Sequence, residues 1–262
     1  MRARAPFAPS PASPRLALRE RQDRLELWTE TVGALPAVYG ERWTTVGERK
    51  YRSFEPARSK LAAALSRGWT GPLPLAGERW LYLGAASGTT ASHVADLVGP
   101  AGRLYAVERS VRPFSRLLQV AERWPNLLPI LGDARAPEAY GEIVPIVDGI
   151  YADVAQPDQV DLVVANARLF GKDRGGAIVI ALKTSSMGRG ASATEHLRAA
   201  EEALPRELTL APSVRLDPFY RSHYLVGGRH GGADRSTLPR RREDRSARPR
   251  SRPDRSVPRR PP

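Results

Sequence analysis

The sequence predicts an α/β protein whose main domain contains a mostly parallel, doubly wound β-sheet. Three observations support this prediction. Five short segments are apolar on both faces, helical segments separate them, and a glycine-rich turn follows the first of them. Strands that are apolar on both faces are buried between two layers of helices, and parallel strands need such helical crossovers.

The individual elements can be placed along the chain. Strands are expected over residues 80–84, 103–107, 127–131, 147–153 and 176–183, with two final strands near 207–216 and 222–227. Helices are expected over 61–67, 91–99, 111–123, 158–170 and 192–203. Strand-like pieces separated by glycine and proline predict a small β-rich domain at 28–55, which leaves 56–228 for the α/β domain.

The two ends of the chain differ from its middle in charge. The chain has 41 Lys and Arg against 28 Asp and Glu, a net charge of +13. Residues 1–24 contribute +4 and residues 229–262 contribute +8, so the residues between them contribute only +1. Both ends are rich in proline, and such composition buries too little apolar surface to fold. We expect disordered arms at 1–27 and 229–262, which either attract RNA phosphates or are passive solvated tails.

The composition also excludes several classes of protein. The chain contains no cysteine, which excludes disulfide frameworks, zinc fingers, iron–sulfur clusters and thiol nucleophiles. No apolar run approaches the ~20 residues of a membrane span, and the first residues do not resemble a signal peptide. We therefore expect a cytoplasmic protein that does not bind membranes.

Lysine is scarce in this chain. It has 37 Arg but only four Lys, at positions 50, 60, 172 and 183. Because arginine is used wherever a positive charge suffices, each remaining lysine is a candidate for a role that arginine cannot fill. A buried lysine can lose its proton and act as a base, whereas arginine stays protonated.

Candidate ligand-binding residues follow successive strands. They are the turn Gly84–Thr90, then Glu108, Asp133, and Asp153 with Gln156. Ligands of doubly wound sheets bind at the carboxyl ends of the strands. Small residues in the turn let a ligand approach the backbone, Glu108 can accept hydrogen bonds from ribose hydroxyls, and Asp133 can accept one from an adenine amino group. The order predicts an adenosine-bearing cofactor, with S-adenosylmethionine favoured over a dinucleotide because the third glycine of the dinucleotide motif is missing.

Several longer segments resemble the fibrillarin family, particularly its shorter archaeal form. They are RSKLAAAL (58–65), LYLGAASGTTASHVADLVGP (81–100), LYAVE (104–108), PILGDAR (129–135) and DVAQPDQ (153–159). VYGE (38–41), KYRSFEPARSK (50–60) and SHYLVG (222–227) extend the likeness, which covers roughly residues 31–227.

The resemblance implies a function and a set of partners. Fibrillarins are S-adenosylmethionine-dependent ribose 2′-O-methyltransferases of box C/D guide-RNA particles, acting in archaea on ribosomal and transfer RNA. The resemblance therefore implies a Rossmann-like class I methyltransferase domain behind the β-rich domain. It also implies three partners, namely a box C/D guide RNA, a Nop-domain scaffold protein and a kink-turn-binding protein of ribosomal type.

The resemblance also implies particular site residues. The family's catalytic Lys, Asp, Lys and His map onto Lys60, Asp153, Lys183 and His223. We expect Lys183 to accept the ribose hydroxyl proton, kept neutral by the charge of Lys60 and by partial burial, with Asp153 orienting it and His223 positioning Lys60 or the ribose. No metal is expected. The complete set of candidate cofactor-binding residues is Gly84, Ala85, Ser87, Gly88, Thr89, Thr90, Glu108, Arg109, Asp133, Ala134, Asp153, Val154, Ala155 and Gln156.

The sequence departs from the family pattern in three places. Residues 109–112 replace the usual aromatic and Ala-Pro-Arg, residues 184–190 replace a Ser-Arg-Ser type of continuation, and Gly149 lies inside an expected core strand. Two other functions therefore stay open. One is a non-catalytic subunit of the same RNA particle, and the other is a methyltransferase that modifies a protein glutamine.

Overall fold

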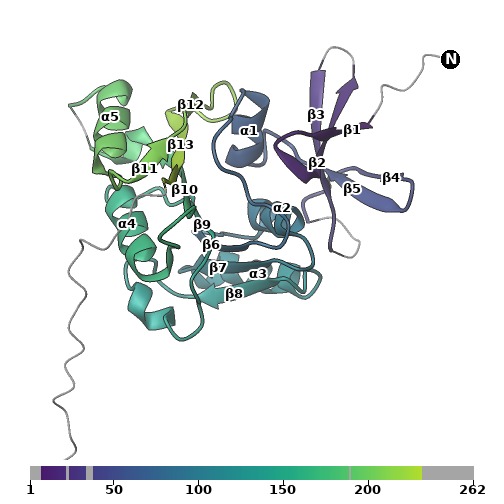
Figure 1. The fold of residues 1–262 in the computed structure, drawn as a ribbon, viewed down its shortest axis with the longest axis horizontal. Helices are drawn as coiled ribbons and strands as arrows, with labels where there is room; N and C mark the ends of the chain where they lie inside the picture. The colour runs from purple at the N-terminus through teal and green to yellow at the C-terminus, as the bar shows by residue number, and fades with distance from the viewer. Residues whose placement is uncertain (1–6, 22–23, 34–37, 189, 232–262) are drawn as a thin grey trace, which may run out of the picture.

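A computed structural model of the chain describes residues 7–21, 24–33, 38–188 and 190–231. It contains a small antiparallel sheet at the N-terminal end and a larger α/β domain (Figure 1). The small sheet has the strand order β1-β2-β3-β5-β4. Its strands are β1 (Phe7–Ser10), β2 (Ser13–Arg21), β3 (Arg24–Glu30), β4 (Trp43–Val46) and β5 (Arg49–Ser53).

The prediction of a disordered arm at 1–27 is wrong over the described part of that segment. The strands β1, β2 and the first half of β3 occupy it, so the β-rich domain begins at residue 7 and not at 28. The physical reason is that Leu16 and Ala17 on β2, together with Leu27 and Trp28 on β3, are at most 3% exposed. Pairing of these two short apolar stretches in one antiparallel hairpin outweighs the proline-rich composition around them.

Arg15, which the sequence placed in the basic arm, is a structural residue. Its guanidinium donates to the carbonyl oxygens of Asp96, at 2.6 Å, and Glu30, at 2.9 Å. The positive charge therefore ties β2 to the α/β domain and is not available to a phosphate.

The α/β domain contains a sheet with the order β11-β13-β10-β9-β6-β7-β8, and β12 pairs with β13. The strands β10, β9, β6, β7 and β8 are parallel, whereas β13 is antiparallel to β10. The bounds are β6 (Arg79–Leu83), β7 (Arg103–Glu108), β8 (Leu127–Leu131), β9 (Gly149–Ala152), β10 (Ala177–Lys183), β11 (Leu208–Leu210), β12 (Val214–Arg215) and β13 (His223–His230). The predicted mostly parallel sheet is confirmed.

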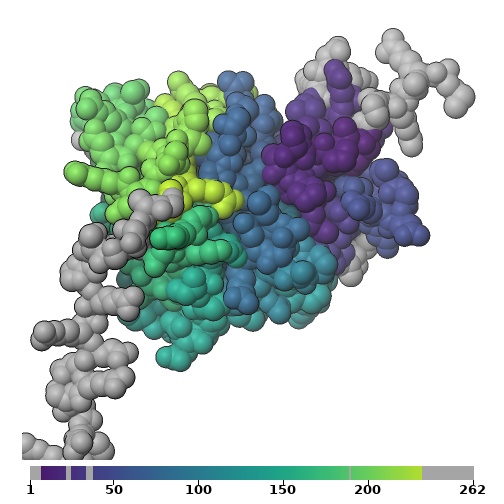
Figure 2. All heavy atoms as spheres, in the orientation of Figure 1, coloured from purple at the N-terminus to yellow at the C-terminus, as the bar shows by residue number. Residues whose placement is uncertain are grey.

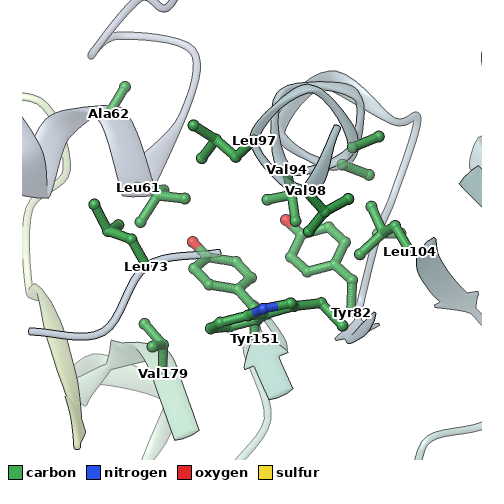
Figure 3. Close-up of a cluster of buried hydrophobic side chains, with 14 of the residues drawn as sticks. Leu61, Ala62, Leu73, Tyr82, Val94, Leu97, Val98, Leu104, Tyr151 and Val179 are labelled. Atoms are coloured by element: carbon green, nitrogen blue, oxygen red, sulfur yellow. The ribbon is translucent and has the colours of Figure 1, made fainter. Parts of the chain in front are cut away.

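Helices cover both faces of this sheet (Figure 1). They are α1 (Lys60–Ser66), α2 (Thr89–Val98), α3 (Val111–Ala121), α4 (Gln159–Phe170) and α5 (Ala193–Ala203), with short 3-10 turns at Pro137–Tyr140 and Thr184–Ser186. One buried cluster joins the sheet to α1, α2 and α3, and Figure 3 shows Leu61, Val94 and Leu97 packed over Tyr82 and Tyr151. A second cluster joins the other face to α4 and α5. The doubly wound arrangement is therefore confirmed.

Gly149, unexpected in a core strand, is explained by the packing around it. A Cβ atom at this position would lie 2.5 Å from the indole ring of Trp80, which is fully buried on the neighbouring strand β6. The large ring fills the volume that a side chain at 149 would need.

The C-terminal boundary also differs from the prediction. The strand β13 continues to His230, so the expected arm at 229–262 does not begin at 229, and its residues 232–262 lie outside the described residues. Arg229 donates to the carbonyl of Gly175 at 2.9 Å, which fixes this end of the sheet. No helix in the described ranges is long and apolar enough to cross a membrane.

A buried polar network joins the small sheet to α2. Arg52 on β5 donates to Asp96 at 2.6 Å and to Glu41 at 2.8 Å, and none of these side chains is exposed to solvent. The imidazole of His93 lies between Thr29 and Tyr39, at 2.8 Å from each hydroxyl. Figure 2 shows the purple N-terminal residues seated directly against the blue segment of the larger domain. Because a buried ion pair is costly to break, the network fixes the position of the small sheet on α2.

Candidate functional site

A cavity of about 200 Å³ lies at the carboxyl ends of β6, β7, β8 and β9. This is the edge at which ligands bind in doubly wound sheets. Its walls are formed by Gly84, Ala86, Val107, Glu108, Arg109, Ser110, Gly132, Asp133, Ala134, Arg135, Asp153, Val154, Ala155, Gln156 and Leu162. The loops after four parallel strands therefore meet here, as the sequence predicted.

The first wall of the cavity depends on the glycine at position 84. Gly84 has a φ of +80°, and a Cβ atom there would lie 2.6 Å from the carbonyl oxygen of Asp153. The backbone after β6 can therefore approach the loop after β9 closely only without a side chain. Ala86, two residues after Gly84, also has a positive φ, of 48°. Its backbone N–H donates to the carboxylate of Glu108, which holds it in that conformation.

The carboxylate of Glu108 holds two loops together. Its two oxygens accept hydrogen bonds from the backbone N–H groups of Ala86, at 2.9 Å, and Ser110, at 2.7 Å. The residue is only 7% exposed. Each carboxylate oxygen has a second lone pair, so Glu108 can still accept hydrogen bonds from a diol inside the cavity.

The opposite wall contains an arginine that the sequence analysis missed. Arg135 binds both carboxylate oxygens of Asp158 at 2.7 Å, and it also donates to the side chain of Gln156 at 3.1 Å. Its backbone N–H donates to Asp133 at 3.0 Å. Arg135 thus fixes two predicted cofactor-binding residues, Asp133 and Gln156. The sequence signal was present in the segment GDAR, but the partner Asp158 comes from a different loop.

Some of the predicted cofactor-binding residues do not line this cavity. They are Ala85, Ser87, Gly88, Thr89 and Thr90. Gly88 precedes α2, and Thr89 and Thr90 form its first turn. The hydroxyl of Thr90 donates to that of Ser59 at 3.0 Å, inside the protein. These residues shape the turn, and Thr90 links α2 to the start of α1.

A cluster of charged side chains adjoins the cavity at Asp153. The ammonium of Lys60, the first residue of α1, lies 2.7 Å and 2.8 Å from the two carboxylate oxygens of Asp153. Both side chains are less than one-fifth exposed. Asp153 also lines the cavity, so the ion pair lies at its edge, next to the position of any ligand that the cavity binds.

Lys183 and His223 lie on neighbouring strands of the same cluster. They are directly opposite in the antiparallel register of β10 and β13, so their side chains are on the same face. Within the described ranges, no carboxylate forms an ion pair with Lys183. The buried side chain of Gln159 binds the backbone of Lys183 through two hydrogen bonds, of 3.0 and 3.2 Å, and thereby fixes the end of β10.

The electrostatics of His223 show that these groups act on one another. Burial lowers the pKa of His223, and the positive charges of Lys60 and Lys183 lower that pKa further, against the opposing effects of the Arg221 carbonyl and of Asp153. Its Nδ1 atom lies 2.7 Å from the carbonyl oxygen of Arg221, which leaves Nε2 for another partner. The structure therefore brings the four predicted catalytic residues together.

Tyr220 belongs to the cluster and was not predicted. Its ring centroid lies 5.2 Å from the ammonium of Lys60 and 5.9 Å from that of the His223 ring. Burial and the charge of Asp153 raise the pKa of Tyr220 to about 12, so the phenol is neutral near pH 7. In the sequence, the resemblance in this region was limited to the segment SHYLVG (222–227). Tyr220 was missed because it lies two residues before that segment.

Comparison with known proteins now assigns the chain to a family. The family model described as "Fibrillarin" matches residues 16–231, which contain the cavity and the whole cluster. The chain belongs to the fibrillarin family. A fibrillarin-like rRNA/tRNA 2′-O-methyltransferase of Aeropyrum pernix is 47% identical over 191 residues, 72% of this chain and 81% of that protein. An rRNA 2′-O-methyltransferase fibrillarin of Eremothecium gossypii is 41% identical over 217 residues, 78% of this chain and 66% of that protein.

Solved fibrillarin structures have the same fold. The Methanococcus jannaschii fibrillarin pre-rRNA processing protein gives a TM-score of 0.77 at 35% identity and covers 83% of this chain and 95% of that one. Aeropyrum pernix fibrillarin, crystallised with natively bound S-adenosyl-L-methionine, gives 0.75 at 38% identity and covers 87% of this chain and 100% of that one. A fibrillarin/Nop5p complex gives 0.71 at 38% identity, with 80% of this chain and 96% of that chain covered.

Proposed function

We propose that this protein transfers a methyl group from S-adenosylmethionine to the ribose 2′-hydroxyl of rRNA and tRNA. The observation that supports the proposal most directly is the Lys60–Asp153 ion pair at the edge of the cavity, with Lys183 and His223 on the adjoining strands. The names of the related proteins, and the S-adenosyl-L-methionine bound in one of them, support the same reaction and cofactor.

The residues present fit this cofactor. Gly84 lines the cavity and lets the backbone after β6 lie close to the Asp153 loop, and the spare lone pairs of Glu108 suit the ribose diol. Asp133 is partly exposed at the far wall, where its carboxylate can accept from the adenine amino group. When bound, the cofactor supplies an electrophilic methyl group on a sulfonium that is already a good leaving group.

The protein then has to activate the ribose hydroxyl and align it. We assign proton acceptance to the Lys183 amine, because Lys60 is engaged by both oxygens of Asp153 whereas Lys183 has no carboxylate partner among the described residues. The sequence analysis expected Asp153 to orient Lys183. Asp153 is instead paired with Lys60, and we assign to Gln159 the fixing of the Lys183 backbone, to which it makes two hydrogen bonds.

His223 has a supporting position in this proposal. Its lowered pKa keeps the imidazole neutral near pH 7, so it can exchange hydrogen bonds without adding a third positive charge beside the two lysines. The proton leaves the 2′-hydroxyl oxygen for Lys183 as the oxygen attacks the methyl carbon in line with the departing sulfur. The products are the 2′-O-methylated ribose, the demethylated cofactor and a proton on the lysine, so the step is balanced.

We further propose that the protein works in a box C/D guide-RNA particle. A related fibrillarin has been crystallised with Nop5p, which supports a Nop-domain scaffold partner for this chain. A kink-turn-binding protein of ribosomal type and a cytoplasmic location both follow from the resemblance and the sequence, and they stay predictions.

The test is transfer of labelled methyl from S-adenosylmethionine to a target RNA, with and without guide RNA and the two partner proteins. Guide-dependent labelling of a single ribose 2′-oxygen supports the proposal. Cofactor binding with no transfer in the complete particle would favour a non-catalytic subunit. Labelling of a protein glutamine in place of RNA would favour the protein methyltransferase.

A further inference from the structure

A second cavity, of about 850 Å³, forms a groove between the small N-terminal sheet and the α/β domain. One side comes from β2, β3 and Arg42, the residue before β4, and the other side comes from the end of α1 and from Pro218 and Phe219. None of its lining residues belongs to the first cavity or to the cluster of Lys60, Asp153, Lys183 and His223. This interdomain groove lies where the two parts of the chain meet.

Two chain segments lead from the interdomain groove to the catalytic cluster. Phe219 lines the groove, and the next residue, Tyr220, covers the ammonium of Lys60. Pro56 and Ala57 also line the groove, and the chain reaches Lys60 three residues after Ala57. A polymer whose reacting unit lies at Lys60 and Asp153 would therefore enter this groove with its neighbouring units.

The charges around the groove leave two cations without a carboxylate. Both acidic side chains in its wall, Glu26 and Glu55, are bound by Arg42, at 3.0 and 3.3 Å. Arg67 lines the groove at the end of α1, and Arg58 directly follows the lining residue Ala57. Both are exposed, and no ion pair to either occurs in the described part of the chain. Two unpaired guanidinium groups beside a groove with neutralised acids complement an anionic ligand.

The groove also exposes an aromatic ring. Phe219 is 40% exposed, although a phenylalanine in a folded protein is usually buried. Exposed aromatic rings between cations are typical of surfaces that bind RNA strands, because the ring contacts a base or sugar while the cations bind phosphates.

We propose that the interdomain groove binds the RNA strand that is methylated, on one side of the reacting nucleotide. Arg58 and Arg67 bind its phosphates, and Phe219 packs against one of its nucleotides. The proposal rests on the proposed function, because it identifies how the same site holds its RNA substrate.

The experiment uses the full chain assembled with guide RNA and the partner proteins. The variants are Phe219→Ala and Arg67→Ala, and the matched control is Arg206→Ala, which removes an exposed arginine from the loop before β11, outside the groove. Melting temperatures confirm that all three variants are folded.

We expect Phe219→Ala to raise the KM for target RNA about 5-fold or more, since one base–aromatic contact is worth about 1–3 kcal/mol. We expect Arg67→Ala to make the slope of log K for RNA binding against log salt concentration shallower by slightly less than one, the change that loss of one phosphate contact produces. The kcat at saturating RNA and the affinity for S-adenosylmethionine are expected to stay unchanged in both variants, and Arg206→Ala is expected to match the wild type.

A photo-crosslinking readout separates this proposal from the proposed function. Target RNA carrying 4-thiouridine next to the methylated nucleotide is expected to crosslink to the peptide that contains Phe219, whether or not methyl transfer occurs. Three results together overturn the groove assignment and leave the proposed function intact. They are methylation by the wild type, an unchanged KM for RNA in both groove variants, and no crosslink at Phe219. Loss of scaffold binding in the variants, with RNA crosslinking elsewhere, also overturns it and assigns the groove to a protein partner. A crosslink at Phe219 without transfer supports the groove and contradicts the proposed function.

Discussion

Lys60 and Asp153 form a bidentate ion pair, with the ammonium 2.7 and 2.8 Å from the two carboxylate oxygens. The pair distinguishes the two lysines of the cluster, because only Lys60 is bound by a carboxylate. The amino group of Lys60 is bound by its carboxylate and by the ring of Tyr220, whereas no described carboxylate binds the amino group of Lys183. A base must lose its proton, so the unpaired lysine is the better candidate.

Replacing Lys183 by alanine should therefore lower the rate of methyl transfer by about 10²–10⁴-fold and leave the affinity for S-adenosylmethionine nearly unchanged. Lys183→Arg should be equally inactive, because a guanidinium does not accept a proton near neutral pH. The rate is measured with labelled cofactor at saturating RNA, and Lys172→Ala, an exposed lysine paired with Asp148, is the control. Full activity of Lys183→Ala would exclude it as the base.

Replacing Glu108 by alanine should weaken binding of S-adenosylmethionine by about tenfold or more. The change removes the carboxylate that can accept hydrogen bonds from the ribose diol, and a hydrogen bond to a charged group contributes about 1.5–3 kcal/mol. It also leaves the backbone N–H groups of Ala86 and Ser110 without their acceptor. Calorimetric titration with the cofactor measures the effect, with the exposed Glu142→Ala as control. Equal affinity of the two variants would show that Glu108 is not part of the cofactor site.

Arg135→Ala should have a smaller effect on the cofactor, about two- to fivefold in affinity. Its bond to Asp158 is partly exposed, and such pairs contribute up to about 1 kcal/mol. The loss comes from the freedom given to Gln156 and Asp133. Arg135→Lys should not restore binding fully, since lysine cannot bind Asp158 through two parallel hydrogen bonds. The same calorimetric titration decides, and a complete rescue by lysine would contradict the proposed geometry.

The stability of the protein should fall as the pH drops below about 6.5, the ordinary pKa of histidine. Burial and the charge of Arg52 hold the pKa of His93 well below that value. Below this pH the unfolded chain binds a proton on His93 that the folded protein does not bind. The contribution of His93 to the free energy of unfolding is therefore complete above this pH and decreases below it. Urea unfolding at about pH 7.5 and 5.5 measures the slope, and His93→Gln should be less stable at the higher pH and show a smaller slope. An unchanged slope would assign the effect to other groups, of which His223 is the first candidate.

Gly149→Ala should destabilise the fold by about 1–3 kcal/mol, because its methyl group would overlap the buried ring of Trp80. Gly141→Ala is the matched control, since a Cβ there lies 3.4 Å from its nearest neighbour and the backbone is helical. Thermal unfolding of both variants provides the comparison. Equal stability would mean that Trp80 can move aside.

The sequence predicted the α/β domain well because each core strand is a local apolar run. The strand Leu127–Leu131, for example, has the predicted bounds. It failed for β2 and β3, because composition says little about pairing between Leu18 and Leu27, two residues in separate strands. For the site, the positions at strand ends were predictable, as Glu108 and Asp133 show. Arg135, Gln159 and Tyr220 were missed because their roles depend on partners far away along the chain.

The Lys60–Asp153 pair joins residues 93 positions apart, and Lys183 and His223 are added from still later strands. A ribosome making this chain therefore releases the first lysine long before its carboxylate, and the last imidazole after both. No early fragment can carry the complete chemistry. On the proposed assignment of the cluster, catalytic competence is acquired only when synthesis has passed β13, and unfinished chains cannot modify RNA through it.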